Sequence, residues 1–262
     1  MRKIASLFVA LLLLAGCSSV PLTGRKQVLL VSDQEVLSSS LTQYNDYIKT
    51  AKKSTNANKS AMVTRVGKIA AATEDYLRAN GMADEVKNFS WEFNLVNDPQ
   101  VNAFCMPGGK IVVYEGLLPL VSSDDELAVV IGHEVAHAVA KHSNERMSQQ
   151  LMAQYGAAIL GAAVSNKSAA VQQAANTVYG VGAQYGVMLP FSRKHESEAD
   201  YMGLVFMTMA GYNPDVAVNF WQKMSAGKSG STPEFMSTHP SDATRIAEIQ
   251  KVLPAIKTKY KK

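Results

Sequence analysis

Apolar residues recur at intervals of three and four along much of the chain, which is the spacing of amphipathic helices. A first helix is predicted from Ser32, which forms a capping box with Glu35 ahead of an apolar stripe. A second helix is predicted over residues 60–80 and ends at Gly81. Further helices are predicted from Pro190 to Gly211, from Asn213 onward, and over residues 242–253 with an end at Pro254.

The pattern changes to period two over residues 89–96, where large apolar side chains alternate with smaller or polar ones. This alternation predicts a strand with one apolar face. After the turn "NDP", two extended runs flank Pro107, Gly108 and Gly109, which is typical of a hairpin. Together these elements predict an α+β fold, mostly helical, with a small sheet just upstream of residue 124.

The helix predicted over residues 124–142 carries polar groups in its most apolar part. The stretch "LAVVIGHEVAHAV" places His133, Glu134 and His137 among leucine, valine, isoleucine and alanine. Each buried polar group costs kilocalories of free energy unless a partner satisfies it. The helix therefore requires a partner for all three side chains.

Two histidines four residues apart on a helix lie on nearly the same face, so both imidazoles can reach one metal ion at about 2.0–2.1 Å. The HExxH pattern of His133 and His137 is typical of zinc, and Glu134 can take a proton from a water on that ion. Zinc then requires one more protein ligand. His142 is out of phase by more than a right angle on the predicted helix, so the ligand must come from elsewhere.

"HESEAD", residues 195–200, is the acidic cluster on a later predicted helix. Glu196 and Asp200 are one turn apart and share a face, whereas Glu198 lies nearly opposite. That face suits a metal ligand and a hydrogen-bonding partner for a ligating histidine. A solvated acidic face is the alternative for such a cluster alone, and the preceding "HEVAH" favours metal binding.

Residues 147–188 are rich in alanine, glycine, glutamine and serine, with two apolar runs separated by "SNKS". We expect a helical insertion of two loosely packed helices, neither long nor apolar enough to cross a membrane. Few large side chains are present to fix this segment. It is therefore expected to shield the substrate groove when the groove is empty.

The first sixteen residues have the pattern of a signal peptide, with Arg2 and Lys3 ahead of an apolar run. That run is shorter than the roughly 20 residues that span a bilayer. "LAGC" resembles the lipobox of bacterial lipoproteins, which implies a mature chain lipidated at Cys17, and Ser18 favours the outer membrane. Residues 17–31 are then expected to be a tether, and residues 32–262 a single domain.

Removal of Arg2 and Lys3 lowers the basic count from 26 to 24 against 22 acids, so the net charge falls from +4 to +2. A nearly neutral chain gives no indication of nucleic-acid binding. With Cys17 lipidated, Cys105 is the thiol that remains in the sequence. An intrachain disulfide is then excluded, and stability must come from the core.

Four stretches, in this order, resemble the gluzincin metalloproteases of the CAAX prenyl endopeptidase type, metallopeptidase family 48: "VNAFCMPGGKIVVYEGLL", "GHEVAHAVAKH", "ESEADYMG" and "STHPSDATRI". The resemblance implies a zincin-like fold. It also implies one Zn²⁺ per chain, bound by His133, His137 and Glu196, with Glu134 as the general base and Asp200 as a supporting residue.

By the same resemblance, His239 and Arg245 of "HPSDATR" lie in the active site. His239 would either stabilise the oxyanion or approach the metal as an inhibitory ligand. By spacing alone, His239 is an ordinary loop histidine. Members embedded in the membrane have several transmembrane helices, whereas this sequence has none after its signal. The soluble lipoprotein branch is therefore favoured, and prenylated substrates are not expected.

The expected reaction is hydrolysis of internal peptide bonds in unfolded or misassembled envelope proteins, on the periplasmic side of the outer membrane. A substrate peptide is expected to add as a strand along the hairpin, at Asn102, Ala103, Phe104, Gly108 and Gly109. The alternative is a chaperone or assembly factor for outer-membrane proteins with a closed zinc site. A purely structural zinc protein is less favoured because such sites have four protein ligands and often use thiolates. The oligomeric state stays open.

Overall fold

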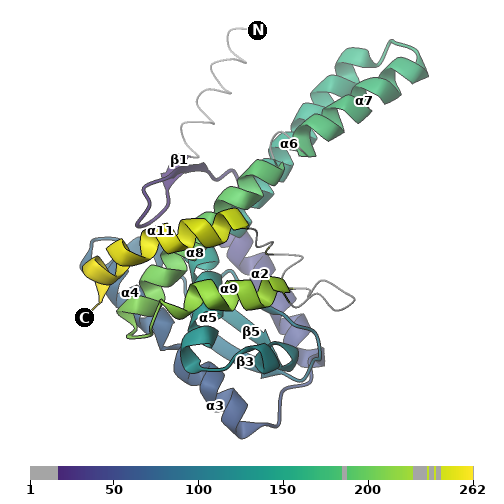
Figure 1. Cartoon of the computed structure of the whole chain (residues 1–262). Coiled ribbons are helices and arrows are strands. Elements are labelled where there is room, and N and C mark those ends of the chain that lie inside the picture. Colours follow the sequence, from purple (N-terminus) through teal and green to yellow (C-terminus); the bar gives the residue numbers. More distant parts are fainter. Residues whose placement is uncertain (1–16, 185–187, 227–234, 236–238, 240–242, 262) are drawn as a thin grey trace.

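The computed structural model describes residues 17–184, 188–226, 235, 239 and 243–261. Its helices are α2 (Asp33–Thr50), α3 (Ala57–Val66), α4 (Lys68–Ala79), α5 (Asp124–Val139), α6 (His142–Val164), α7 (Ala169–Ala183), α8 (Leu189–Met209), α9 (Val216–Ala226) and α11 (Ala243–Tyr260), with short 3₁₀ turns η1 (Ala83–Glu85) and η2 (Glu115–Leu120). Strands β3 (Glu92–Val96), β4 (Ala103–Met106) and β5 (Lys110–Tyr114) form one sheet, and β1 (Cys17–Ser19) pairs with β2 (Lys26–Val28). The architecture is α+β and mostly helical, as the sequence predicted (Figure 1).

The larger sheet has the strand order β3–β5–β4. The hairpin predicted around Pro107 is confirmed, because β4 and β5 are antiparallel neighbours, and β3 runs parallel to β5. The strand predicted over residues 89–96 is regular only from Glu92. This order leaves β4 at an edge of the sheet, and β4 lies against α5.

The helix predicted over residues 60–80 is two helices, α3 and α4, which meet at Gly67. The ring of Phe93 lies against this glycine, where a Cβ atom would be 2.8 Å from the ring. The bend allows α3 to contact β3 while α4 contacts α8. Apolar spacing alone does not reveal this break, because both halves keep the same helical period.

Helix α5 is at the centre of the core. Its N-terminus is where the sequence predicts it, with the Ser123 hydroxyl accepting a hydrogen bond from the Glu126 amide. Every residue from Leu127 to Ala136 is buried, and α5 contacts β4, α3, α4, α8 and α9. His133 and Glu134 are therefore enclosed by protein, as the sequence predicted, whereas His137 is partly exposed.

The end of α5 differs from the prediction, which placed it near residue 142. The helix ends at Val139, Lys141 adopts a left-handed conformation with φ of 57°, and α6 begins at His142. The chain therefore changes direction before His142. As a result, the helical phase of α5 does not tell where the His142 side chain points.

Residues 147–188 contribute to two helices, as predicted, but they do not cover the sheet. The first turns of α6 are buried, and the rest of α6 projects from the molecule together with α7 (Figure 1). Because α6 is one helix of 23 residues, it carries the segment outward. The expectation that this segment shields the groove is therefore wrong. Its exposed apolar side chains include Tyr155, Ile159, Val171, Val178 and Val181.

The segment expected to be a tether, residues 17–31, packs against the rest of the chain. Strands β1 and β2 form a short hairpin in which Cys17 is opposite Val28. Val20 is 1% exposed within the main core, and Gln27 is 3% exposed. This part of the segment is therefore docked on the protein rather than extended from it.

The last helix continues beyond its predicted end at Pro254, and α11 ends at Tyr260. A proline within a helix removes one backbone hydrogen bond. Packing compensates, because Ile256 is 1% exposed and the ring of Tyr260 contacts that of Tyr76. Among the helices that the structure describes, none has the length and apolar content required to cross a membrane.

Candidate zinc centre

Close packing of α5 against α8 brings the predicted ligands together. The two helices meet at Gly132 and Gly203, and a Cβ atom on Gly203 would be 2.7 Å from the backbone nitrogen of His133. Glycine at both positions lets the backbones approach closely. The face of α8 that carries Glu196 and Asp200 therefore lies opposite the histidines of α5.

Four side chains converge at this point: His133, His137, Glu196 and His239, with one potential ligand atom from each within 4.8 Å of the others. Nε2 of His133 is 3.0 Å from Nε2 of His137 and 3.3 Å from Oε2 of Glu196. Nδ1 of His239 is 3.2 Å from Nε2 of His133 and 3.1 Å from Oε2 of Glu196. The structure thus brings together the three predicted ligands and His239.

These atoms fit zinc in both spacing and chemistry. Ligands at 2.0–2.1 Å from a tetrahedral ion are about 3.3 Å apart. Nδ1 of His133 lies 3.0 Å from the Asp200 carboxylate, which can only accept a hydrogen bond, so Nδ1 is protonated and Nε2 faces the other ligands. Two imidazoles and a carboxylate around one point form the donor set that zinc prefers.

Protonation of His133 competes with metal binding. Burial lowers the pKa of His133, but its hydrogen bonds to Asp200 and Glu196 outweigh burial and raise the pKa to about 9. Burial likewise favours a neutral Glu196, yet His137 and the other histidines hold its pKa well below the usual range. A metal ion on Nε2 of His133 must therefore displace a proton, and affinity falls as the pH is lowered.

Glu134 has one oxygen engaged and one directed at the centre. Its Oε2 accepts a hydrogen bond of 3.0 Å from the backbone amide of Cys105 on β4. Its Oε1 is buried, makes no hydrogen bond with any residue that the structure describes, and lies 3.5 Å from Nε2 of His239. Burial raises the pKa of the Glu134 carboxyl. A buried acceptor with this pKa direction beside a metal site suits a general base.

Asp200 and Arg245 contact the ligand cluster on the side of His133 that faces away from the other ligands. Arg245 donates to both oxygens of Asp200, at 2.7 and 2.8 Å, and to the carbonyl of His239 at 3.3 Å. Burial favours the neutral form of Asp200, but Arg245 and His133 outweigh it and lower the pKa of this carboxyl. Arg245 therefore keeps Asp200 charged, and Asp200 orients His133.

The predicted substrate edge is partly formed. In β4, the backbone amide groups of Ala103 and Cys105 face away from β5, and they donate to the Asn102 side chain and to Glu134. Gly108 and Gly109 lie instead in the turn that follows β4, and their carbonyl groups accept from the amides of Ser90 and Glu92. Asn102, Ala103 and Phe104 are thus at the edge, whereas Gly108 and Gly109 are not.

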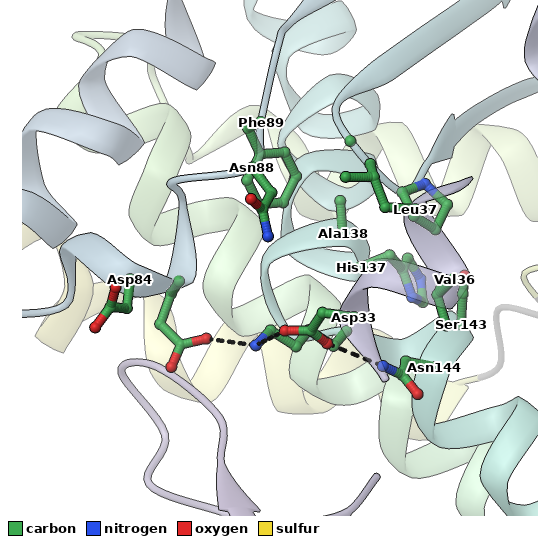
Figure 2. A pocket seen from close by; sticks show the side chains of 14 residues that line it. Asp33, Val36, Leu37, Asp84, Asn88, Phe89, His137, Ala138, Ser143 and Asn144 are labelled. Carbon is green, nitrogen blue, oxygen red and sulfur yellow. Dashed lines mark hydrogen bonds and ion pairs between the residues drawn. The ribbon is translucent and has the colours of Figure 1, made fainter. Parts of the chain in front are cut away.

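A pocket opens beside His137 (Figure 2). Its walls include the apolar side chains of Val36, Leu37, Phe89 and Ala138, together with Gly108. Among the polar groups that line it, the Lys141 ammonium lies 2.8 Å from Asp33 and 2.9 Å from Glu85, and the Asn144 amide donates to Asp33. The metal centre is therefore next to a hollow lined partly by apolar side chains and partly by two carboxylates that share one ammonium group.

Sequence reasoning missed a second buried cluster, on the far side of His137. His142, Glu145 and His195 are buried beside Glu198, and Arg25 lies among them. Burial lowers the pKa of His137 and of His142 well below the usual value, so both rings are neutral. The sequence does contain one sign of this cluster. The first turns of α6 carry a run of polar residues, including Glu145, ahead of a mainly apolar continuation.

A donor set of this kind, on a helix packed beside an edge strand, defines the class: a zinc metallopeptidase with a zincin-type fold. Residues 64–253 match Peptidase family M48, and the chain belongs to this family.

Relatives of this chain include proteins named as OMA1 metalloendopeptidases and as β-barrel assembly-enhancing proteases. Mitochondrial metalloendopeptidase OMA1 of Schizosaccharomyces pombe is 38% identical over 185 residues, which cover 70% of this chain and 51% of the relative. The protein of that name from Arabidopsis thaliana is 40% identical over 168 residues, with coverage of 64% and 33%. Beta-barrel assembly-enhancing protease of Escherichia coli is 28% identical over 183 residues, with coverage of 66% and 37%. The chain thus spans about half or less of the length of these curated relatives.

Proposed function

We propose that this protein is a zinc-dependent endopeptidase that cleaves extended segments of unfolded or misassembled envelope proteins. The observation that carries the proposal is the position of Glu134 Oε1, a buried acceptor beside the converging ligand atoms of His133, His137 and Glu196. When bound, zinc supplies a Lewis acid for the scissile carbonyl and for the attacking water. Glu134 takes the proton of that water and delivers a proton to the leaving amine.

The remaining site residues position these groups. Asp200, held by Arg245, fixes the His133 ring with Nε2 towards the metal. His239 contacts Glu196 and lies near Glu134, so in this arrangement its Nδ1 would be a fourth ligand of a bound zinc ion. Catalysis requires that fourth position for water or substrate. His239 would therefore have to move aside before the reaction.

The edge of β4 accounts for the choice of unfolded substrates. A peptide that pairs with β4 is bound mainly through its backbone, which requires several residues free of their own secondary structure. One of its side chains can enter the pocket beside His137, whose apolar walls favour an apolar residue. Folded domains seldom expose such a segment, so selection acts on foldedness more than on sequence.

The envelope location rests on the signal pattern and on relatives. The lipobox-like "LAGC" supports lipidation at Cys17, and a relative from Escherichia coli is named as a protease that enhances β-barrel assembly. The substrates and the lipid-anchored outer-membrane location are proposed on this basis. The mitochondrial names of other relatives agree with the peptidase activity and not with this location.

The test is turnover of one protein in two states. The mature chain, loaded with zinc, is expected to degrade a reduced, unfolded protein and to spare the same protein when folded. A chelator should stop the reaction, and zinc should restore it. Equal cleavage of the compact and the unfolded forms, or a strict requirement for one residue at the scissile bond, would refute capture of extended segments.

A chaperone or assembly factor is the second candidate, and the contacts of His239 favour it because they close the site. His239→Ala separates the two. A protease restrained by His239 should gain turnover in this variant. If the protein acts chiefly as a chaperone, the wild type, His239→Ala and Glu134→Gln should all prevent aggregation of an unfolded client protein to the same extent.

A further inference from the structure

Nδ1 of His137, the ring nitrogen that points away from the zinc centre, contacts the second buried cluster, which contains His142 and Glu198. Nδ1 of His142 lies 2.8 Å from Nδ1 of His137, and Nε2 of His142 lies 3.1 Å from Oε2 of Glu198. His142 is 2% exposed and Glu198 is 8% exposed. A continuous path of contacts therefore leads from Glu198 through His142 to His137.

The direction of the hydrogen bonds along this path follows from Glu198. A carboxylate only accepts, so Nε2 of His142 carries a proton, and a ring with one proton then offers Nδ1 as an acceptor. Nδ1 of His137 is then the donor. A neutral imidazole has one N–H, so Nε2 of His137 keeps its lone pair, the form in which it can bind zinc.

The N-terminal segment holds Glu198 in place. The Thr23 hydroxyl donates to Oε1 of Glu198 at 2.5 Å, and Nε of Arg25 donates to Oε2 at 2.8 Å. Arg25 also donates to both oxygens of Glu145, at 2.9 and 2.7 Å. The Arg25 side chain is 12% exposed, so the contact lies within the protein rather than on its surface.

We propose that Glu198 and His142 are positioning residues that fix His137 in its zinc-binding tautomer, and that Thr23 and Arg25 of the N-terminal segment complete this relay. The inference rests on the zinc ligation by His137 proposed above. It gives residues 17–28 a role at the metal centre, because the path from that segment to the ligand passes through two side chains. It also explains why Glu198 is buried although it faces away from the metal.

The tests are the zinc dissociation constant, from competition with a chromophoric chelator, and histidine ¹⁵N NMR of the zinc-loaded chain. In wild type, His142 is expected to be protonated on Nε2 and His137 on Nδ1. Glu198→Gln offers an amide that can donate to His142, which favours the opposite tautomer. We expect zinc affinity to fall about 10–100-fold in Glu198→Gln and in His142→Ala.

Two further variants separate the relay from general damage. His142→Asn can place its amide oxygen where Nδ1 was, so it should bind zinc more tightly than His142→Ala. Glu145→Gln removes a carboxylate from the same buried cluster, but Glu145 contacts Arg25 and His195 rather than His142. It should weaken zinc binding no more than Arg25→Gln does, because the hydrogen bonds of Glu145 reach the relay through Arg25. Arg25→Gln should weaken zinc binding less than Glu198→Gln, because it acts one contact further away.

Wild-type zinc affinity in both Glu198→Gln and His142→Ala would overturn the relay. So would an NMR assignment that places the His142 proton on Nδ1 in the wild type. His137→Ala tests the ligand itself. If His137→Ala keeps zinc, the proposed metal site fails. If it loses zinc while the His142 and Glu198 variants do not, the relay alone fails.

Discussion

At the scale of single residues, three glutamates within the same core have different tasks because their partners differ. Glu134 accepts from the backbone of β4 and directs its other oxygen at the metal centre. Glu196 contacts both histidines of α5, and Glu198 faces Arg25 and His142. Burial alone does not distinguish them, since all three are buried. The partners assign each carboxylate its chemistry.

Glu134→Gln separates catalysis from metal binding. The amide keeps the size of the side chain, and Glu134 lies outside the ligand set, so zinc content should be unchanged. Peptide hydrolysis should fall by about 10²–10⁴-fold, the usual contribution of a general base. Zinc analysis and turnover of an unfolded protein on the same sample test this. Wild-type turnover with bound metal would show that another group takes the proton.

Glu196→Ala should weaken zinc binding more than any change at Glu198, because it removes a direct carboxylate ligand and leaves only His133, His137 and His239 at the centre. Glu198→Gln is the matched comparison on the same helix. This variant should still bind one zinc ion per chain when zinc is in excess, since Glu198 contacts the ligand His137 only through His142. Metal analysis after dialysis measures both. Equal zinc content in the two variants would contradict the assignment of Glu196.

At the scale of elements, the sequence predicts most helices, the hairpin and the face of α8 that carries Glu196 and Asp200. These features depend on local period and capping, which the sequence displays directly. The break at Gly67, the turn at Lys141 and the passage of α11 through Pro254 depend on tertiary contacts instead. His142 was excluded as a partner of the site because its phase was counted along a helix that ends before it.

The approach of α5 to α8 can be tested at Gly203. Gly203→Ala places a Cβ atom 2.7 Å from the His133 backbone nitrogen, so the two helices must separate. We expect a loss of about 1–3 kcal/mol in the free energy of unfolding and weaker zinc binding. Denaturant unfolding and zinc competition measure the two effects.

Gly161→Ala in α6 is the control for that substitution, since a Cβ atom there meets nothing within 4 Å. It should be neutral or stabilise the protein by about 0.4–1 kcal/mol, through reduced freedom of the unfolded chain. Its zinc affinity should equal that of wild type. If Gly203→Ala behaved in the same way, close helix packing would not be what places the ligands.

At the scale of the whole molecule, the Arg25–Glu145 pair joins the N-terminal segment to α6. Burial favours the neutral form of Glu145, but the hydrogen bonds from His195 and Arg25 outweigh it and lower the pKa of this carboxyl to about 2. A carboxyl with a lowered folded-state pKa stabilises the fold above its unfolded pKa, near 4.3. This stabilisation is lost as the pH falls towards 2.

Glu145→Gln should therefore be less stable than wild type at pH 7, by about 2 kcal/mol. The difference should shrink as the pH is lowered from about 4.5 to 2, because only the wild type loses a charged carboxylate. Urea unfolding of both proteins over this range measures the effect. A difference that stayed constant down to pH 2 would show that the Glu145 charge does not hold the segment.

Anchoring is the last property that belongs to the whole molecule. Cys17 pairs with Val28 in a hairpin that packs on the core. A lipid on Cys17 would therefore hold the folded domain close to the bilayer, without a long flexible linker between them. One acyl chain binds a membrane only marginally, whereas several hold it firmly. Cys17→Ser should therefore release the protein from membranes or leave it unprocessed, while zinc affinity stays unchanged because Thr23 and Arg25 are intact. Membrane fractionation and zinc competition on the same preparations test both parts. Wild-type protein found entirely in the periplasmic fraction would contradict the anchor without affecting the metal centre.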